Sequence, residues 1–247
     1  MAGGVTPLKY EELRKISTRL YATCMHQWAG DSHPLLHLKA KVEIVKNRLL
    51  MRVQNNCDIQ TTNILLNLVS DSYSWCLQLL DATLQHNVSL AAYCARNILE
   101  LWVWTTYCIK SPGNANDFVQ DAMKDINGLL IPIRRLASLA GPDSTKSWSP
   151  ETWAALSTID SMGKLKTDFI PVSEAANTIG KEDGAIFSIL NKVFSKFAHP
   201  TALVVSGIMN EELSKPIITF CLTAGLSLFK RILDQLTEHT KLPTTQP

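Results

Sequence analysis

The segment from Leu90 to Lys110 constrains the fold most, because apolar residues occupy nearly every face of the helix that it predicts. Its apolar members are Leu90, Tyr93, Cys94, Ile98, Leu99, Leu101, Trp102, Val103, Trp104 and Tyr107. A helix that is apolar all round must be covered by other elements on all sides. The segment therefore predicts a central helix surrounded by others.

The rest of the chain supplies those other helices. Spacings of three and four between apolar residues are typical of amphipathic helices. They predict helices over 7–29, 34–55, 59–86, 115–139, 150–159, 174–179, 184–198 and 216–239. No strand-like alternation is present, and eleven glycines and eleven prolines in 247 residues are few for a turn-dense β fold. We predict an all-α fold, a single helical bundle of long antiparallel helices.

Composition along the chain suggests how this bundle is organised. Residues 141–173 are rich in glycine, proline and serine, and predict an irregular excursion. We expect residues 1–57 to form a helical pair packed on the bundle. We expect residues 58–240 to form the helical core, one continuous fold, and residues 241–247 to form a disordered tail.

Several features predict a cytoplasmic protein. The N-terminus lacks the basic and apolar regions of a secretory signal. The six cysteines include no Cys-x-x-Cys pair, which favours small buried thiols in a reducing compartment. We expect no membrane span, because Arg96, Asn97 and Glu100 interrupt one apolar stretch and the other, 217–229, is short.

Charge and motifs exclude several function classes. Residues 1–56 hold nine basic and four acidic residues, which fits either a solvated helix face or a surface for a polyanion. The dinucleotide, phosphate-loop, zinc-protease and serine-hydrolase motifs are missing. His33 and His37 have metal-ligand spacing, but Pro34 suggests that His33 precedes the helix, so we interpret them as surface histidines. No metal or cofactor is expected.

The first candidate for chemistry is the pair Arg96 and Glu100. Residues four apart meet on one face of a helix, and this helix is otherwise apolar. Burying two charges is costly unless they are paired and further hydrogen-bonded. The pair therefore predicts either a core ion pair tying two helices together or a polar cleft.

The second candidate is the stretch from Lys192 to Thr201. Ser195 and His199 are four apart, near the end of a helix that Pro200 breaks, and Lys196 lies on the same face or next to it. A histidine at a helix C-terminus is easily kept charged by the helix dipole. The set suits either proton transfer beside cations on a phosphodiester, or a histidine that caps the last turn.

These two candidates carry a resemblance. The run from Arg96 and Asn97 to Glu100, followed by Ser195, His199 and Pro200, resembles an uncharacterised prokaryotic all-helical family of unknown function. That family is in turn distantly similar to the HEPN superfamily, and the resemblance covers about residues 58–239. It implies a HEPN-like helical bundle, often dimeric. Many HEPN proteins are metal-independent ribonucleases of toxin or defence systems, with an arginine, a polar residue and a histidine a few positions on. This chain departs from that pattern, because no histidine follows Arg96 within six residues.

Two main hypotheses follow. In the first, the protein is a non-catalytic binding or regulatory module in which Arg96, Glu100 and His199 form a buried polar cluster with Asn97 and Ser195 beside it. In the second, it is an RNA-cleaving enzyme: His199 is the acid or base, Arg96 and Lys196 hold phosphate, and Glu100 orients Arg96. RNA and a second copy of the chain are the expected partners. A third possibility is a small-ligand pocket lined by Trp102 and Trp104.

Overall fold

A computed structural model describes residues 34–55, 58–139, 170–199 and 211–241 of the chain. These residues form seven helices and, within the described ranges, no strand, which confirms the all-α class. The helices are α2 (Pro34–Gln54), α3 (Ile59–Leu84), α4 (Val88–Lys110), α5 (Asn114–Leu139), α8 (Val172–Ile179), α9 (Lys181–Ala198) and α11 (Glu211–His239). The predicted helices at 7–29 and 150–159 and most of the predicted excursion lie outside the described residues.

The helices belong to two compact units. Six of them, α2, α3, α4, α8, α9 and α11, pack together as a bundle, and α5 belongs to the second unit. Taken by itself, α5 is one helix that continues through Pro132.

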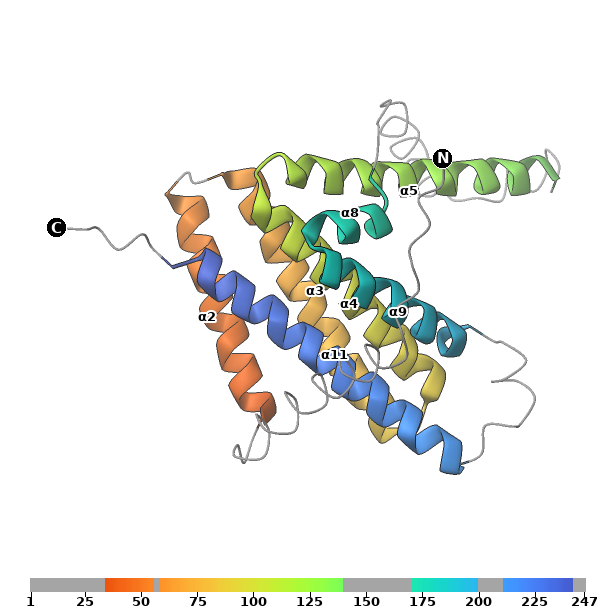
Figure 1. Cartoon of the computed structure of the whole chain (residues 1–247). Helices are drawn as coiled ribbons and strands as arrows, with labels where there is room; N and C mark the ends of the chain where they lie inside the picture. The colour runs from red at the N-terminus through yellow and green to blue at the C-terminus, as the bar shows by residue number, and fades with distance from the viewer. Residues whose placement is uncertain (1–33, 56–57, 140–169, 200–210, 242–247) are drawn as a thin grey trace. The chain divides into compact units, whose positions relative to one another are not determined.

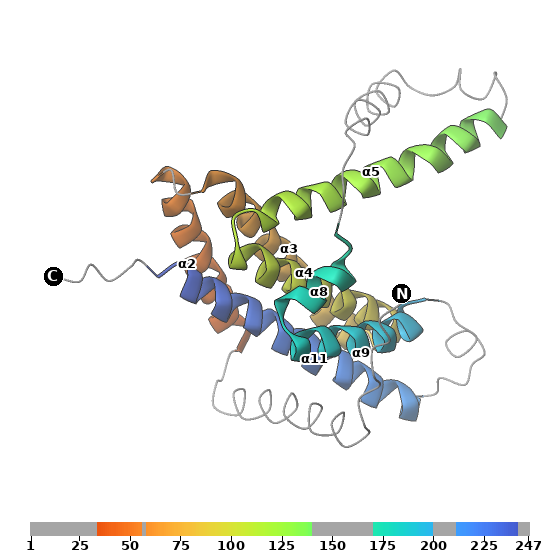
Figure 2. The same ribbon diagram turned by 45° about the horizontal axis from the view of Figure 1, so that its top comes forward.

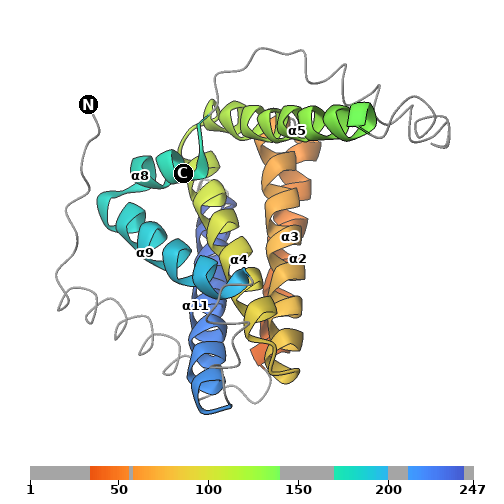
Figure 3. The ribbon, with the colours of Figure 1, turned by 90° about the vertical axis from the view of Figure 1, so that its right-hand side faces the viewer.

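The bundle has three layers, and α4 lies in the middle one (Figure 1). It packs against α3 and α11 and, on its other side, against α8 and α9. Figure 3 shows α2 and α3 on one side of α4 and α11, with α8 and α9 on the opposite side. Thirteen of the 23 residues of α4 are buried, which confirms it as the central helix.

Short polar caps set where the long helices begin. Asp58 accepts a hydrogen bond from the Thr61 backbone N–H at 3.2 Å and starts α3 at Ile59, the residue at which the sequence predicts this helix to begin. Asn87 accepts from the Leu90 N–H at 3.0 Å and starts α4 at Val88. Helix α4 therefore begins two residues before Leu90, where the apolar pattern predicts its start. The turn between α3 and α4 is short enough to make the two helices antiparallel neighbours, with His86 in the left-handed region at φ 54°.

The apolar contact between α4 and α11 is close at Gly225. A Cβ at this position would overlap Leu79 Cδ2 of α3, and would lie 3.6 Å from Ile98 Cδ1 and 3.7 Å from Ala95 Cα of α4. A side chain at position 225 would therefore require the Leu79 side chain to shift, whereas its distances to α4 would be those of ordinary van der Waals contact. The described cysteines, Cys76, Cys94, Cys108 and Cys221, are all free thiols buried in this core.

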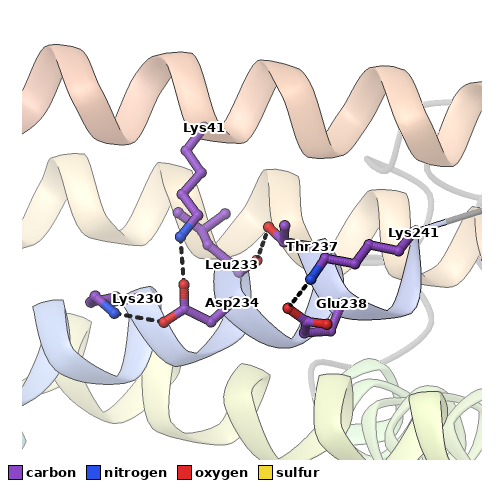
Figure 4. Close-up of polar contacts among 7 residues, drawn as sticks. All are labelled: Lys41, Lys230, Leu233, Asp234, Thr237, Glu238 and Lys241. Carbon is purple, nitrogen blue, oxygen red and sulfur yellow. Dashed lines mark hydrogen bonds and ion pairs between the residues drawn. The ribbon is translucent and has the colours of Figure 1, made fainter.

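An ion-pair cluster joins α2 to α11 (Figure 4). Asp234 of α11 accepts from Lys41 of α2 at 2.5 Å and from Lys230 of its own helix at 2.6 Å. Desolvation raises the pKa of Asp234, but the hydrogen bonds from Lys230 and Lys41 outweigh it, and the net pKa is lowered.

Helices α8 and α9 meet at an elbow beside α4 (Figure 2). Gly184 allows the approach, because a Cβ there would lie 2.8 Å from Asn177 Oδ1 and 3.1 Å from Ala176 O. Lys110, in the last turn of α4, donates to the carbonyl oxygens of Thr178 and Ile179 and so satisfies the C-terminal end of α8. The elbow fixes the direction in which α9 crosses α4.

By length and composition alone, Glu212–His239 could cross a membrane. The buried core helix of a soluble protein meets the same criterion, so this is weak evidence. In the structure α11 packs on α4, α3 and α2, and its apolar residues Cys221, Leu228, Phe229, Ile232, Leu233 and Leu236 are fully buried.

Candidate functional site

Arg96 links α4 to α9 at the outer edge of their contact. Its Nη2 forms an ion pair with Glu100 Oε1 at 3.1 Å, as the four-residue spacing predicts. Its Nε donates to Asn191 Oδ1 of α9 at 3.0 Å. The side chains of Arg96 and Glu100 are 30% and 31% exposed. The pair is therefore partly solvated, at a depth between the core and the open surface.

This geometry fixes the guanidinium in one orientation. Glu100 balances its charge, and the Asn191 amide oxygen holds its Nε, so two of its three nitrogens have partners. A guanidinium held in this way presents a planar donor of the kind that recognises phosphate or carboxylate oxygens.

His199 does not join this group in the described structure. It is the C-cap residue of α9, with extended backbone angles (φ −97°, ψ 152°), and it is exposed. It follows Asn191 by eight residues, which corresponds to about 12 Å along a helix. The described residues therefore contain no buried cluster of Arg96, Glu100 and His199, because Arg96 is anchored two turns back along α9.

The outward face of α9 is basic toward its C-terminus. Lys192, Lys196 and His199 stand at spacings of four and three, which places them on one face, and all three are exposed. The sequence from Gly184 to His199 contains no aspartate or glutamate. We call this surface of Lys192, Lys196 and His199 the basic stripe.

Asn97 and Ser195 take separate places. Asn97 Nδ2 donates to the Tyr93 carbonyl oxygen at 2.8 Å, so its amide serves its own helix. Ser195 is half-buried, one turn after Asn191 on α9. The residue that sequence analysis missed is Asn191 itself. A polar residue four positions before Ser195, within an otherwise apolar run, was the available signal.

The tryptophans of α4 are core residues. Trp102 is 1% exposed and Trp104 is 6% exposed. The guanidinium of Arg231 lies 5.5 Å from the centre of the Trp102 ring, and Trp104 meets Tyr107 edge to face at 5.9 Å. These contacts account for both rings by packing.

The described residues contain no group of three or more histidine, cysteine, aspartate or glutamate side chains placed to hold a metal ion. His37 is exposed on α2, and His33 lies outside the described residues. In comparisons with known proteins, the chain matches no family model, no curated protein and no solved structure.

Proposed function

We propose that this protein is a non-catalytic RNA-binding module whose contact surface is the basic stripe of α9. The observation that carries the proposal is the stripe itself: three exposed basic or titratable side chains on one helix face, in a segment without acidic residues. The net charge of the whole chain is only +2, so attraction of a polyanion has to come from a local concentration of charge.

The side chain of Arg96 adds a guanidinium next to the basic stripe. It is anchored to Asn191, the residue next to Lys192, so a guanidinium donor lies beside the start of the stripe. Phosphate contacts from lysine and arginine supply affinity without base specificity. We therefore expect binding that depends strongly on salt and weakly on RNA sequence.

The absence of catalysis in this proposal follows from the placement of His199. A general acid or base acts on a proton within hydrogen-bond reach, and a second group must stabilise the charge that develops. His199 and Arg96 are anchored about two helical turns apart along α9. Hydrolysis by a metal-independent, HEPN-like mechanism remains the second candidate, favoured by the exposed His199 one turn after Lys196.

The test is a salt titration with a fluorescein-labelled single-stranded 20-mer of uridine, read by anisotropy. We expect Lys192→Gln with Lys196→Gln to weaken binding and to reduce the slope of log Kobs against log salt by about 1.4, or about 0.7 per lost phosphate contact. The matched control is Lys39→Gln with Lys46→Gln on α2, which removes the same charge from the basic N-terminal region.

The control decides between a site and a general charge effect. Equal loss in the two double variants would contradict a site on α9, and no binding by the wild type at low salt would contradict the function. A second assay distinguishes binding from hydrolysis. The same RNA is incubated with the wild type or with His199→Ala, and its length is then analysed on a gel. Cleavage by the wild type and none by the variant would replace the binding module with a ribonuclease.

A further inference from the structure

Tyr93 of α4 places an aromatic ring at the surface of the bundle, where it is 43% exposed. The described part of the chain exposes seven other large apolar residues, and each of those is leucine, isoleucine or methionine. An exposed aromatic ring differs from them because it gives a planar ligand a surface on which to stack.

Trp75 of α3 holds the Tyr93 ring in position. The two ring centroids lie 5.5 Å apart and the ring planes meet at 80°, which is an edge-to-face contact. The side chain of Asn97 also donates to the Tyr93 carbonyl oxygen at 2.8 Å. Because the ring already has a fixed neighbour, a ligand that stacks on it loses little free energy in ordering it.

The contacts of α4 with α8 and α9 place Tyr93 at the level of the basic stripe. Lys110, at the C-terminal end of α4, donates to the carbonyl oxygens of the last turn of α8, directly before α9. Arg96, fourteen residues earlier on α4, binds Asn191 of α9. Helix α9 therefore runs along α4 in the opposite direction (Figure 1). In this register Tyr93 is level with residues 194–195, which lie within the basic stripe.

The surface of α4 next to the ring suits a negatively charged ligand. Arg96 follows Tyr93 by three residues, so the two side chains are neighbours on the helix. Glu100 is the only acidic residue of α4. It lies seven residues from Tyr93, about 10 Å along the axis, and its charge is paired with Arg96. The ring is thus beside a cation, and α4 adds no unpaired carboxylate.

We infer that Tyr93 is a stacking platform for an unpaired base of an RNA whose phosphates contact the basic stripe. The inference rests on the proposed function and narrows it to single-stranded RNA, because a base within a duplex is already paired and stacked. Stacking on an aromatic ring accepts every base, so it agrees with weak dependence on sequence. Tyr93 adds affinity without adding a phosphate contact.

The experiment separates stacking from charge. The labelled 20-mer of uridine is titrated at several salt concentrations with the wild type, Tyr93→Leu and Tyr93→Phe. Tyr93→Leu keeps an apolar side chain but removes the ring, so we expect binding to weaken about tenfold. The slope of log Kobs against log salt should not change, because no phosphate contact is lost. Tyr93→Phe keeps the ring and should bind within about twofold of the wild type.

A control variant and a second ligand make the test specific. Leu77 is 44% exposed and follows Trp75 by two residues, which places it on another side of α3. Leu77→Ala should therefore bind as the wild type does. The second ligand is the same 20-mer annealed to its complement. We expect the wild type to prefer the single strand and Tyr93→Leu to lose that preference, because pairing withdraws the bases from the ring.

The results that contradict this inference differ from those that contradict the proposed function. No binding of either RNA by the wild type would contradict the proposed function, and the inference with it. If the wild type binds and Tyr93→Leu, folded by circular dichroism, binds equally well, the stacking platform alone is overturned. A preference of the wild type for the duplex would also overturn it. So would a reduced salt slope in Tyr93→Leu, because the ring would then act through the phosphate contacts.

Discussion

The two sides of α4 differ in burial and in the kind of contact that they make, although their residues are neighbours in the sequence. Ala95 and Ile98 are fully buried and lie next to Gly225 of α11. Arg96, which follows Ala95, reaches α9 through an amide and is 30% exposed. One side holds the bundle together by exclusion of water. The other fixes a charged group where water and ligands still reach it.

This difference assigns stability and function to separate surfaces. Deep burial makes the first side intolerant of any change in volume. The second side can lose an ion pair at small cost, because a partly solvated charge keeps much of its hydration. Candidate functional groups on α4 and α9 should therefore be replaceable without unfolding the protein.

The largest expected effect concerns the thiols on the apolar side. Burial raises the pKa of Cys94 to about 11 and that of Cys221 to about 12, from an ordinary value of 9.0. At pH 8 the thiolate fraction of Cys221 should be about a thousandfold below that of an unfolded chain. We expect alkylation by iodoacetamide in the native protein to be slower by about a hundredfold at Cys94 and about a thousandfold at Cys221, and to keep rising with pH above 9. Peptide mass spectrometry follows each cysteine separately. Rapid labelling of Cys221 in the folded protein would show that the contact between α4 and α11 admits solvent.

The next largest effect is on the free energy of unfolding, and it concerns the same apolar side of α4. Ile98→Ala removes a fully buried side chain beside Gly225 and leaves a cavity between α4 and α11. We expect a loss of about 2–5 kcal/mol in the free energy of unfolding. Urea denaturation followed by circular dichroism measures it. A loss below about 1 kcal/mol would mean that the helices close the gap easily and that their contact is loose.

The smallest effect belongs to the other side. Arg96→Ala removes a partly exposed ion pair and one hydrogen bond, so we expect a loss of about 1 kcal/mol by the same measurement. The matched variant Arg96→Lys keeps the charge but cannot reproduce the Nε bond to Asn191 together with the ion pair. If Arg96→Ala lowers the free energy of unfolding by about 3 kcal/mol or more, the ion pair behaves as a buried pair. The two sides of α4 would then not differ in their contribution to stability.

Much of the helical framework could be predicted from local patterns. The all-round apolar character of residues 90–110 identified the central helix, and the predicted start at residue 59 is the first residue of α3. Boundaries were less predictable. The last helix begins at Glu211, five residues before the predicted start at Pro216, and Pro216 lies inside it.

In the candidate site, too, some features follow from spacing along the chain and others only from the tertiary structure. The sequence by itself determined the ion pair of Arg96 with Glu100 and the common face of Lys192, Lys196 and His199, because residues three or four apart on a helix must be neighbours. Only the tertiary structure decided that Asn191 is the group that holds Arg96, and that His199 stands two turns away from it. Those relations depend on where α9 crosses α4, which is set by the elbow at Gly180 and Gly184 and by the packing of α8, and not by any spacing along the chain.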